Sequence, residues 1–422
     1  MSGSDRKILI TGIGFAGAAG NGVASLAGRL RDGNSALRLF FEEERPIPLL
    51  QVGAFLGGDW NWQQTDGAQG LGHHALDRAK KLLRGADTSL QADACALWEA
   101  KGSAAIAPDR LGLVVGGSNL AHPMLYDEMA RFQRNPSYIN PRIGFHALDT
   151  HVAATLAALA QARGPALNVA AAAASGAVAA VTALDLIRSG RCDACLAVGA
   201  MQRLSPMDWN ALAMLGALNI TAEIPIPFGG EGKGFAPGEG AACVLLERAD
   251  HAQRRGVAGL AELAGGAFVS GSDPLPHPCR DDESKVMALA LADAGMNPRQ
   301  IDLITAHATG TPKGDEAEAG AIADLLGDEL GRVWVAAPKA VTGHCLTAAG
   351  LVGLIATVLM LVENRVYPLP RLSNSPSPPA AFRLAVGAAV KARLRCAISN
   401  AFGFGGFNAS LVLRSLSDWP KT

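Results

Sequence analysis

The chain has 422 residues, of which 49% are hydrophobic, and this is enough to bury one large core or two fused ones. Its 37 basic and 38 acidic residues leave a net charge of −1, which excludes an overall positive field that would attract nucleic acid or an anionic membrane. The seven cysteines are scattered and odd in number, as is typical of a reduced protein, so we expect a cytoplasmic location.

Short apolar or β-branched runs alternate with helix-like segments along the whole chain, which is the pattern of a layered α/β fold. A first series of strands is predicted over residues 7–11, 111–115, 166–170, 196–198 and 242–246. A second series is predicted over residues 259–264, 303–306, 333–336, 396–399 and 410–414, with helices over 282–294, 315–326 and 348–363. The two series suggest a duplication, with one half over residues 1–250 and the other over residues 251–422.

No segment of the chain has the pattern of a membrane anchor. Residues 1–7 lack the apolar core of a signal peptide. The longest apolar run, residues 348–362, is shorter than the roughly 20 residues that a membrane span needs, and it is rich in Ala and Gly. We therefore expect this run to be a helix buried in protein.

A tight alanine-rich bend follows the third predicted strand and leads through Ser175 and Gly176 into a helix. A bend of this kind usually presents a reactive side chain at the helix N-terminus, where the dipole and the backbone N–H groups favour a thiolate or an oxyanion. Residues 170–174 are all alanine, so this bend presents only methyl groups.

Three later segments show the context of that bend. They read Thr-Ala-His-Ala-Thr-Gly-Thr-Pro at 305–312, Pro-Lys-Ala-Val-Thr-Gly-His at 338–344 and Ser-Asn-Ala-Phe-Gly-Phe-Gly-Gly-Phe-Asn at 399–408. In this order, and behind a Ser-Gly turn, they closely resemble the β-ketoacyl-acyl carrier protein synthases, the condensing enzymes (ketosynthases) of fatty acid and polyketide synthesis. The resemblance runs almost from end to end of the chain.

The resemblance implies the thiolase fold, in which two similar βαβαβαββ halves stack into five α-β-α-β-α layers. It also implies that Ala173 stands at the position of the catalytic cysteine. The join between the halves would fall near residues 247–257, and residues 39–142 would be insertions of the first half.

Two histidines match the family's charge-stabilising pair. By the resemblance, His307 and His344 bind the malonyl thioester carbonyl and stabilise the charge that forms as CO₂ leaves, which is a catalytic role because the N–H groups act where charge develops. Lys339 and Glu318 match a lysine and a buried acid that would form a pair and fix the hydrogen bonding of the histidines. A surface ion pair of little value is the alternative for these two residues.

The remaining site residues are also carried over from the family. Thr309 and Thr311 match hydroxyls that bind the phosphopantetheine arm. Phe402, Gly403 and Gly405 match the family's gating loop. In that loop the aromatic ring separates two pockets, and the glycines let the backbone approach the thioester. Phe404 is better interpreted as a core residue of a Gly-rich hairpin.

Several positions depart from the family pattern. Phe407 stands where threonine is usual, and the loop after Phe228 carries glycines where aspartates are usual, so loop movement and pantetheine contacts are in doubt. Ser175 is expected to cap or pack rather than to replace the nucleophile. Cys345 is the only cysteine near the motifs, and we discount it because the family has an ordinary packing residue there.

Three functions remain open at this point. The leading hypothesis is a decarboxylase that converts malonyl-acyl carrier protein to acetyl-acyl carrier protein, because the chain keeps the histidines but cannot be acylated. The first alternative is a chain-elongating synthase with a Cys-to-Ala change at 173. The second is a non-catalytic partner similar to a chain-length factor, although such a scaffold would not need His307, Lys339 and His344.

The expected partner is an acyl carrier protein, which supplies the phosphopantetheine. We expect no cofactor of the chain's own. The expected assembly is a homodimer, or a heterodimer with a second ketosynthase-like chain. Cys192 and Cys195 have metal-ligand spacing, but no second Cys or His pair lies nearby, so no metal site is expected. Carrier proteins are acidic, so a basic cluster could dock one. The densest basic cluster is Arg78, Lys80, Lys81 and Arg84. A solvated helix face is the alternative interpretation of these residues.

Overall fold

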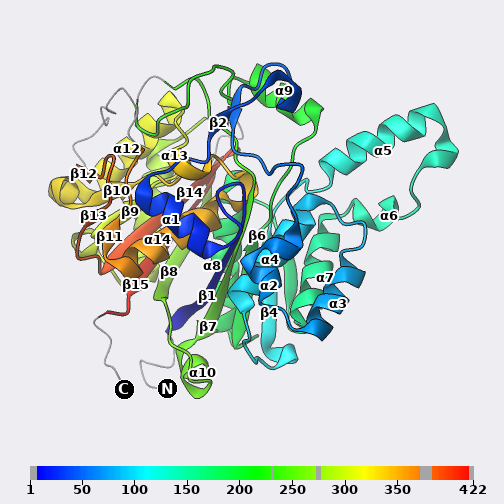
Figure 1. The fold of residues 1–422 in the computed structure, drawn as a ribbon. Coiled ribbons are helices and arrows are strands. Elements are labelled where there is room, and N and C mark those ends of the chain that lie inside the picture. The colour runs from blue at the N-terminus through cyan, green and yellow to red at the C-terminus, as the bar shows by residue number, and fades with distance from the viewer. Residues whose placement is uncertain (1–6, 230–231, 272–276, 371–382, 418–422) are drawn as a thin grey trace.

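The computed structural model describes residues 7–229, 232–271, 277–370 and 383–417. In this part of the chain one large sheet runs through the molecule, with the strand order β12-β10-β9-β14-β15-β8-β1-β7-β6-β4-β5 (Figure 1). Two small two-stranded sheets flank it, and they pair β2 (Arg38–Leu39) with β3 (Val52–Gly53) and β11 (Arg365–Val366) with β13 (Val390–Lys391).

The first half of the chain supplies five neighbouring strands of the large sheet. They are β1 (Ile8–Gly17), β4 (Leu111–Gly116), β5 (Ala166–Val169), β6 (Ala194–Gly199) and β7 (Gly240–Arg248). β7 pairs antiparallel with both β1 and β6, whereas β4 pairs parallel with both β6 and β5. Strand β5 therefore lies at one edge of the sheet.

The second half repeats this topology. Its strands are β8 (Ala261–Ser270), β9 (Leu303–Thr305), β10 (Trp334–Ala336), β14 (Cys396–Gly403) and β15 (Phe407–Ser415), and the short β12 (Arg383–Leu384) extends its edge. β15 pairs antiparallel with β8 and β14, and β9 pairs parallel with β14 and β10. The halves meet where β1 pairs antiparallel with β8. Equal strand order and equal strand directions confirm the predicted duplication.

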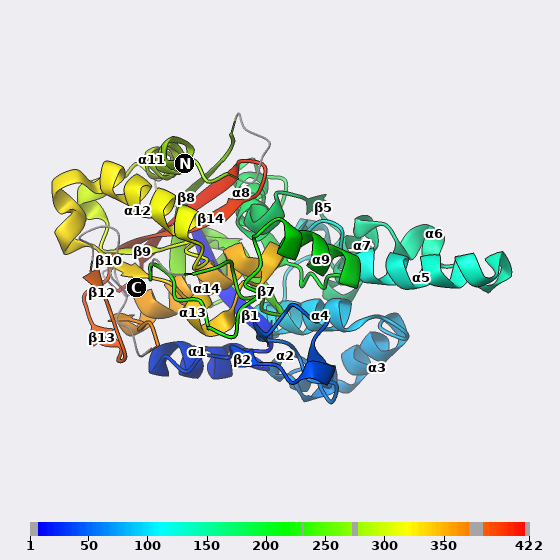
Figure 2. The same cartoon turned by 90° about the horizontal axis from the view of Figure 1, so that it is seen from above.

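Helices form three layers around the two halves of the sheet (Figure 2). Between the halves, α8 (Ser175–Arg188) packs on β4 and β6, α14 (Ala349–Glu363) packs on β14 and β7, and the two helices contact each other. The outer layer of the first half contains α4 (Thr88–Lys101) and α7 (Asp149–Ala160), and that of the second half contains α11 (Arg280–Asp293) and α12 (Pro312–Leu326). The predicted α-β-α-β-α order is thus confirmed.

The other helices lie in connections and insertions. They are α1 (Val23–Asp32), α2 (Asp66–Gln69), α3 (His73–Leu82), α5 (His122–Arg134), α6 (Ile143–His146), α9 (Pro206–Met214), α10 (Ala249–Arg254) and α13 (Lys339–Thr342). Helices α5 and α6 form an arm that projects from the body of the molecule (Figures 1 and 2). The arm begins inside the region that the sequence assigned to insertions, residues 39–142, and α6 extends beyond it.

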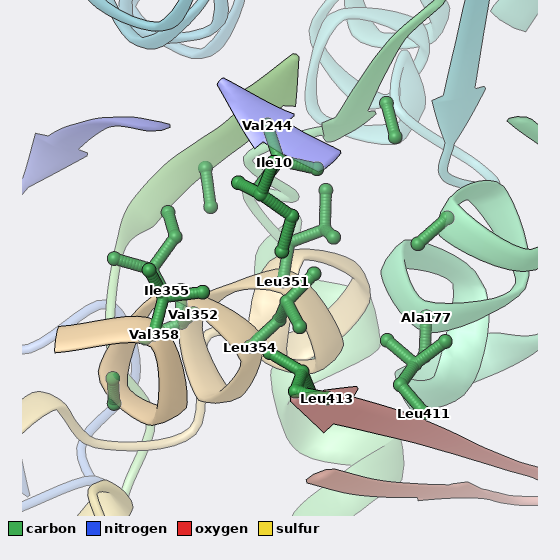
Figure 3. Close-up of a cluster of buried hydrophobic side chains, with 14 of the residues drawn as sticks. Ile10, Ala177, Val244, Leu351, Val352, Leu354, Ile355, Val358, Leu411 and Leu413 are labelled. Atoms are coloured by element: carbon green, nitrogen blue, oxygen red, sulfur yellow. The ribbon is translucent and has the colours of Figure 1, made fainter. Parts of the chain in front are cut away.

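Helix α14 is the centre of the core. Its side chains meet Ile10 of β1 and Val244 of β7 on one side and Leu413 of β15 on the other, and Leu411 of β15 lies beside Ala177 of α8 in the same cluster (Figure 3). By length and composition the segment Leu346–Glu363 could cross a membrane, and 78% of its most apolar window is buried inside the protein. A helix that is apolar all round needs such an enclosure, so the predicted buried helix is confirmed.

The structure lengthens several predicted strands. β1 continues to Gly17 because its second part stays paired with β7, from Gly12 opposite Leu245 to Gly17 opposite Gly240, after a bulge. β14 and β15 pair up to Gly403 and Phe407, so the Gly-rich segment is the turn of a hairpin. Gly405 and Gly406 form this turn with φ of 81° and 76°, a conformation that other residues rarely adopt.

The two central helices cross at a pair of glycines near their N-termini. A Cβ atom on Gly350 of α14 would lie 2.6 Å from the backbone nitrogen of Ala177 in α8. A Cβ atom on Gly176 of α8 would lie 3.1 Å from the backbone nitrogen of Leu351 in α14. The first contact leaves no room for a Cβ and the second is tighter than most Cβ contacts, so the glycines set how closely the first turns of α8 and α14 approach.

We expect Gly350→Ala to destabilise the protein, since the new methyl group would push against backbone that cannot rotate away. Overpacking of this kind costs about 1–3 kcal/mol, measurable by denaturant-induced unfolding. Gly28→Ala in α1 is the matched control, because a Cβ there meets nothing within 4 Å, and it should be neutral or slightly stabilising. Equal stability of the two variants would contradict this account of the helix crossing.

Candidate active site

A cavity of about 1250 Å³ lies where the two halves meet. The first half contributes the alanine bend to its wall, and the second half contributes the histidine segments and the hairpin turn. Predicted site residues that line it are Ala173, Thr309, Thr311, His307, Glu318, His344, Phe402 and Gly403. Segments that are far apart in the sequence, and that were singled out for their motifs alone, therefore share one space.

The alanine bend is a strained turn at the start of α8. Ala172 has a φ of 47°, which is unfavourable for a residue with a Cβ, and residues 172–174 form a single 3₁₀ turn. Ser175 is fully buried, and its Oγ accepts a hydrogen bond from the Ala171 N–H at 2.9 Å and donates one to the Ala172 carbonyl at 2.7 Å. Ser175 braces the turn, and the bend presents only the methyl groups of Ala172 and Ala173 to the cavity.

His344 lies at the equivalent bend of the second half. Leu346, two residues later, has a φ of 48° and opens the 3₁₀ turn that precedes α14. The backbone of His344 is fixed by two hydrogen bonds, its N–H donating to Ala236 O at 2.8 Å and its carbonyl accepting from Gly238 N at 3.0 Å. Gly238 thus anchors this histidine.

The hydrogen bonds of His344 determine which ring nitrogen carries its proton. The N–H of Leu346 donates to His344 Nδ1 at 3.1 Å, so Nδ1 is an acceptor and a neutral ring must carry its hydrogen on Nε2. The ring of Phe235 packs edge-on against it at 4.9 Å between centroids. The free N–H of His344 is therefore the one on Nε2.

Two side chains, those of Glu318 and Lys339, hold His307. Glu318 accepts hydrogen bonds from the backbone N–H groups of His307 at 2.8 Å and of Ala308 at 2.7 Å. Lys339 Nζ donates to the His307 carbonyl and lies 3.3 Å from His307 Nδ1. A charged Lys339 can only donate, so Nδ1 of His307 accepts and its proton, too, is on Nε2.

The predicted Lys–Glu pair is therefore wrong in its form. Among the described residues no ion pair joins Lys339 to Glu318; each side chain instead binds the His307 segment from its own direction. The two charges still act on each other, because Glu318 opposes the loss of the Lys339 proton.

Burial determines the protonation of this group. It lowers the pKa of both histidines well below the usual range, and the charge of Lys339 acts in the same direction. Burial also lowers the pKa of Lys339 to about 8, against the opposing effect of Glu318. At neutral pH the site therefore holds two neutral imidazoles beside one ammonium group.

Phe402 and the two histidines form one wall of the cavity. The rings of His307 and His344 lie 5.5 Å apart at 84°, and the ring of Phe402 lies 5.8 Å from that of His307. Gly403 follows, and a Cβ on it would lie 2.7 Å from Ala171 O and 3.1 Å from Ala173 N. The hairpin and the alanine bend thus approach as closely as backbone allows.

The polar loop after His307 also faces the cavity, where Thr309 Oγ1 and Thr311 Oγ1 lie 2.9 Å apart. Gly405 and Phe407 are not among the lining residues, and Phe407 is 40% exposed. Phe404, expected in the core, is 44% exposed and lines the cavity because it occupies the hairpin turn. The expectation for Phe404 was wrong.

The basic cluster lies elsewhere in the fold. Arg78, Lys80 and Lys81 belong to α3 and Arg84 follows it, and none of them lines the cavity. Arg78 donates to Ala158 O in α7 at 3.0 Å. The cations of the cavity wall are instead Lys233, Arg280 and Lys313. The loop after Phe228 is described only in part, since residues 230 and 231 lie outside the described residues.

Sequence reasoning missed residues that line the cavity, and it missed Asp315, which holds the loop after His307 without lining the cavity. Asp315 accepts hydrogen bonds from Phe228 N at 2.6 Å and Gly310 N at 3.1 Å; its place in the first turn of a predicted helix was a usable signal. Glu283 and Cys279 line the cavity from the N-terminal end of α11 without any motif. Cys279 is thus a second cysteine near the site besides Cys345. Burial raises the pKa of the Cys345 thiol to about 12. Within the described residues no cluster of three or more His, Cys, Asp or Glu side chains could hold a metal ion.

The fold and this site define a condensing-enzyme scaffold, and comparison with known families agrees. Residues 5–252 match the family described as "Beta-ketoacyl synthase, N-terminal domain" and residues 260–373 match "Beta-ketoacyl synthase, C-terminal domain". The chain belongs to the β-ketoacyl synthase family, and its fold is the thiolase fold of the ketosynthases.

Individual relatives match over nearly the full length. The polyketide biosynthesis malonyl-ACP decarboxylase PksF of Bacillus subtilis (strain 168) is 30% identical over 420 residues, covering 97% of each chain. Nodulation protein E of Rhizobium leguminosarum bv. trifolii is 31% identical over 433 residues, covering 98% of this chain and all of the relative.

Solved structures share the fold. The ishigamide ketosynthase/chain length factor superposes with a TM-score of 0.84 at 26% identity, over 97% of this chain and 99% of that one. The type II polyketide synthase complex AntDE:AntF, an acyl carrier protein with its ketosynthase bound to a hexaketide, has a TM-score of 0.83 at 23% identity, over 97% of this chain and 99% of that one.

Proposed function

We propose that this protein decarboxylates malonyl-acyl carrier protein to acetyl-acyl carrier protein. The observation that carries the proposal is the pairing of two fixed imidazole donors, His307 and His344, with a methyl group at Ala173 in the same cavity. The 30% identity to a relative named as a malonyl-ACP decarboxylase supports it.

The chemistry depends on where charge develops. Loss of CO₂ from a malonyl thioester leaves its electron pair in an enolate, whose negative charge rests on the thioester oxygen. The Nε2–H groups of His307 and His344 are already oriented by Lys339 and the Leu346 N–H, so they bind that oxygen without reorganising. With alanine at 173 no acyl-enzyme can form, and the enolate ends as acetyl.

The proposed substrate is carried by an acyl carrier protein. Its phosphopantetheine arm would enter the cavity beside Thr309 and Thr311, whose hydroxyls line the wall. The phosphopantetheine is part of the carrier protein, and the reaction needs no cofactor held by this chain. The cluster of Arg78, Lys80, Lys81 and Arg84 stays our proposed docking surface in the cytoplasm.

A homodimer is the proposed assembly. Edge strand β5 leaves Leu167 41% exposed, so its backbone is available for pairing with a second copy. The arm of α5 and α6 carries further exposed apolar side chains, which include Leu125, Tyr126, Met129, Phe132 and Phe145. One interface could cover both surfaces, and a ketosynthase-like partner chain is the alternative.

The central experiment follows malonyl-acyl carrier protein by intact mass. The protein should convert it to acetyl-acyl carrier protein without acquiring mass itself. His307→Ala and His344→Ala should each slow this by about 10²–10³, the usual cost of one lost oxyanion donor, whereas His74→Ala, at an exposed site, should not. Unchanged malonyl-acyl carrier protein after long incubation with the unaltered protein would refute the proposal and favour a scaffold role.

The pH dependence should report Lys339. Because the pKa of Lys339 is about 8, its ammonium group is lost as pH rises through that value, and Nδ1 of His307 loses the donor that directs its proton to Nε2. Single-turnover decarboxylation should therefore fall above about pH 8. It should show no histidine limb near pH 6.5, since both imidazoles are already neutral there. Lys339→Arg, which keeps the charge, should move the alkaline limb upward; a rate that increases through pH 8 would contradict the assignment.

A chain-elongating synthase with a changed nucleophile is the second candidate, favoured by the intact bend around Ala173. Ala173→Cys separates the two. A thiol at this helix N-terminus should react with an acyl thioester. We expect at most a slow mass adduct and no β-ketoacyl product, and efficient condensation by this variant would instead identify a disabled elongating enzyme.

A further inference from the structure

Glu283 is a buried acid that takes no part in binding the thioester oxygen. It lies in the first turns of α11, only 2% of its surface is exposed, and its Oε2 is buried without a hydrogen-bond partner. It lines the same cavity as His307, His344 and Phe402. A carboxyl oxygen that is buried at a cavity wall without a partner costs stability unless something in the cavity binds it.

The position of Glu283 connects it to the histidine site. Glu283 and Met287 share the buried face of α11, one helical turn apart. The amide of Asn400 contacts Met287 Sδ at 3.3 Å and donates to Glu318 at 3.1 Å, and Glu318 holds the backbone of His307. Glu283 thus stands next to the group that orients His307.

The charge state of Glu283 is set by burial and by these neighbours. Burial raises its pKa to about 9, and the negative charge of Glu318 acts in the same direction, followed by Asp282 and Asp315. At neutral pH its side chain is therefore a carboxylic acid with an O–H to donate.

The proposed decarboxylation requires such a donor, and the role of Glu283 rests on that proposed function. When the bond between the two malonyl carbons breaks, CO₂ leaves and the electron pair stays in the enolate. A condensing enzyme directs that pair to an acyl thioester, but Ala173 carries none, so the product forms only when a proton reaches the carbon. We propose that the carboxylic acid of Glu283 delivers this proton, directly or through one water molecule.

The step balances. The O–H bond of Glu283 breaks, a C–H bond forms at the enolate carbon, and the carboxylate that remains takes a proton from solvent before the next turnover. One proton is consumed for each CO₂ released. The same acid would be harmful in a condensing enzyme, because it would quench the enolate before condensation.

The test measures what happens to the enolate. The holoprotein is given malonyl-acyl carrier protein in a buffer with isotopically labelled bicarbonate and carbonic anhydrase. Acetyl-acyl carrier protein reports protonation, and label in recovered malonyl-acyl carrier protein reports recapture of CO₂. The variants are Glu283→Gln, which cannot supply the proton, Glu283→Asp, which can, and Glu316→Gln, the same chemical change at an exposed position of α12.

We expect Glu283→Gln to lower acetyl formation at least about tenfold and to raise the ratio of label exchange to acetyl formation by a similar factor. Glu283→Asp should recover much of the original ratio, and Glu316→Gln should equal the unaltered protein. A fall in both processes at a constant ratio in Glu283→Gln would show a merely structural role and overturn the proposal. Rapid label exchange in the unaltered protein would also overturn the proposal, and this measurement is informative even if Glu283→Gln does not fold. If the unaltered protein forms no acetyl product at all, the proposed function itself fails.

Discussion

The close crossing of α8 and α14 determines where the site can be. Gly176 and Gly350 let the two helices touch at their first turns, and this brings the bends that precede the helices to the same cavity. Both bends contain a left-handed residue with a side chain, Ala172 and Leu346. Such residues persist only where the surrounding structure compels them. The duplicated fold thus places two strained turns face to face, one from each half.

The two turns differ in what they carry. The first presents the methyl group of Ala173, and the second follows His344, whose ring it fixes through the Leu346 N–H. Lys339 and Glu318 fix His307 by binding its backbone. Burial keeps the imidazoles neutral while Glu318 and Asp315 help Lys339 to keep its proton. The site is therefore preorganised for negative charge on a ligand without a charged histidine.

Motifs predicted those parts of the site whose geometry is local. His307, Lys339 and His344 stand in short segments in which strand ends and tight turns define the backbone, so it could be foreseen that they lie close together, with both histidines in the cavity wall. The binding partners of Lys339 and Glu318 could not, because the two side chains meet the His307 segment only after α12 and α13 have packed. Glu283 and Cys279 carry no local signal at all, since their place in the wall depends on how α11 lies against β8 and β15.

The strand series and the central helix were likewise predictable from apolar patterning, whereas strand lengths were not. β1 runs past its expected end because β7 continues to pair with it after a bulge, and β14 and β15 run on to the hairpin turn. Long-range pairing of this kind has no counterpart in the local sequence. The pairing of β14 with β15 also places Phe404 in the hairpin turn, and therefore in the cavity wall and not in the core.

The fate of an enolate in this cavity depends on the groups around it. In the function that we propose, the histidines stabilise the oxyanion in either outcome, so their presence alone does not separate condensation from decarboxylation. The group that lies beside the enolate carbon must decide between the two reactions: an acyl thioester leads to condensation, and a proton donor leads to decarboxylation alone. In this chain the position of the acyl thioester is occupied by the methyl group of Ala173, and a neutral acid, Glu283, lies in the wall of the same cavity. With a methyl group at position 173 no acyl-enzyme can form, which removes condensation, and a nearby acid would make protonation of the enolate fast.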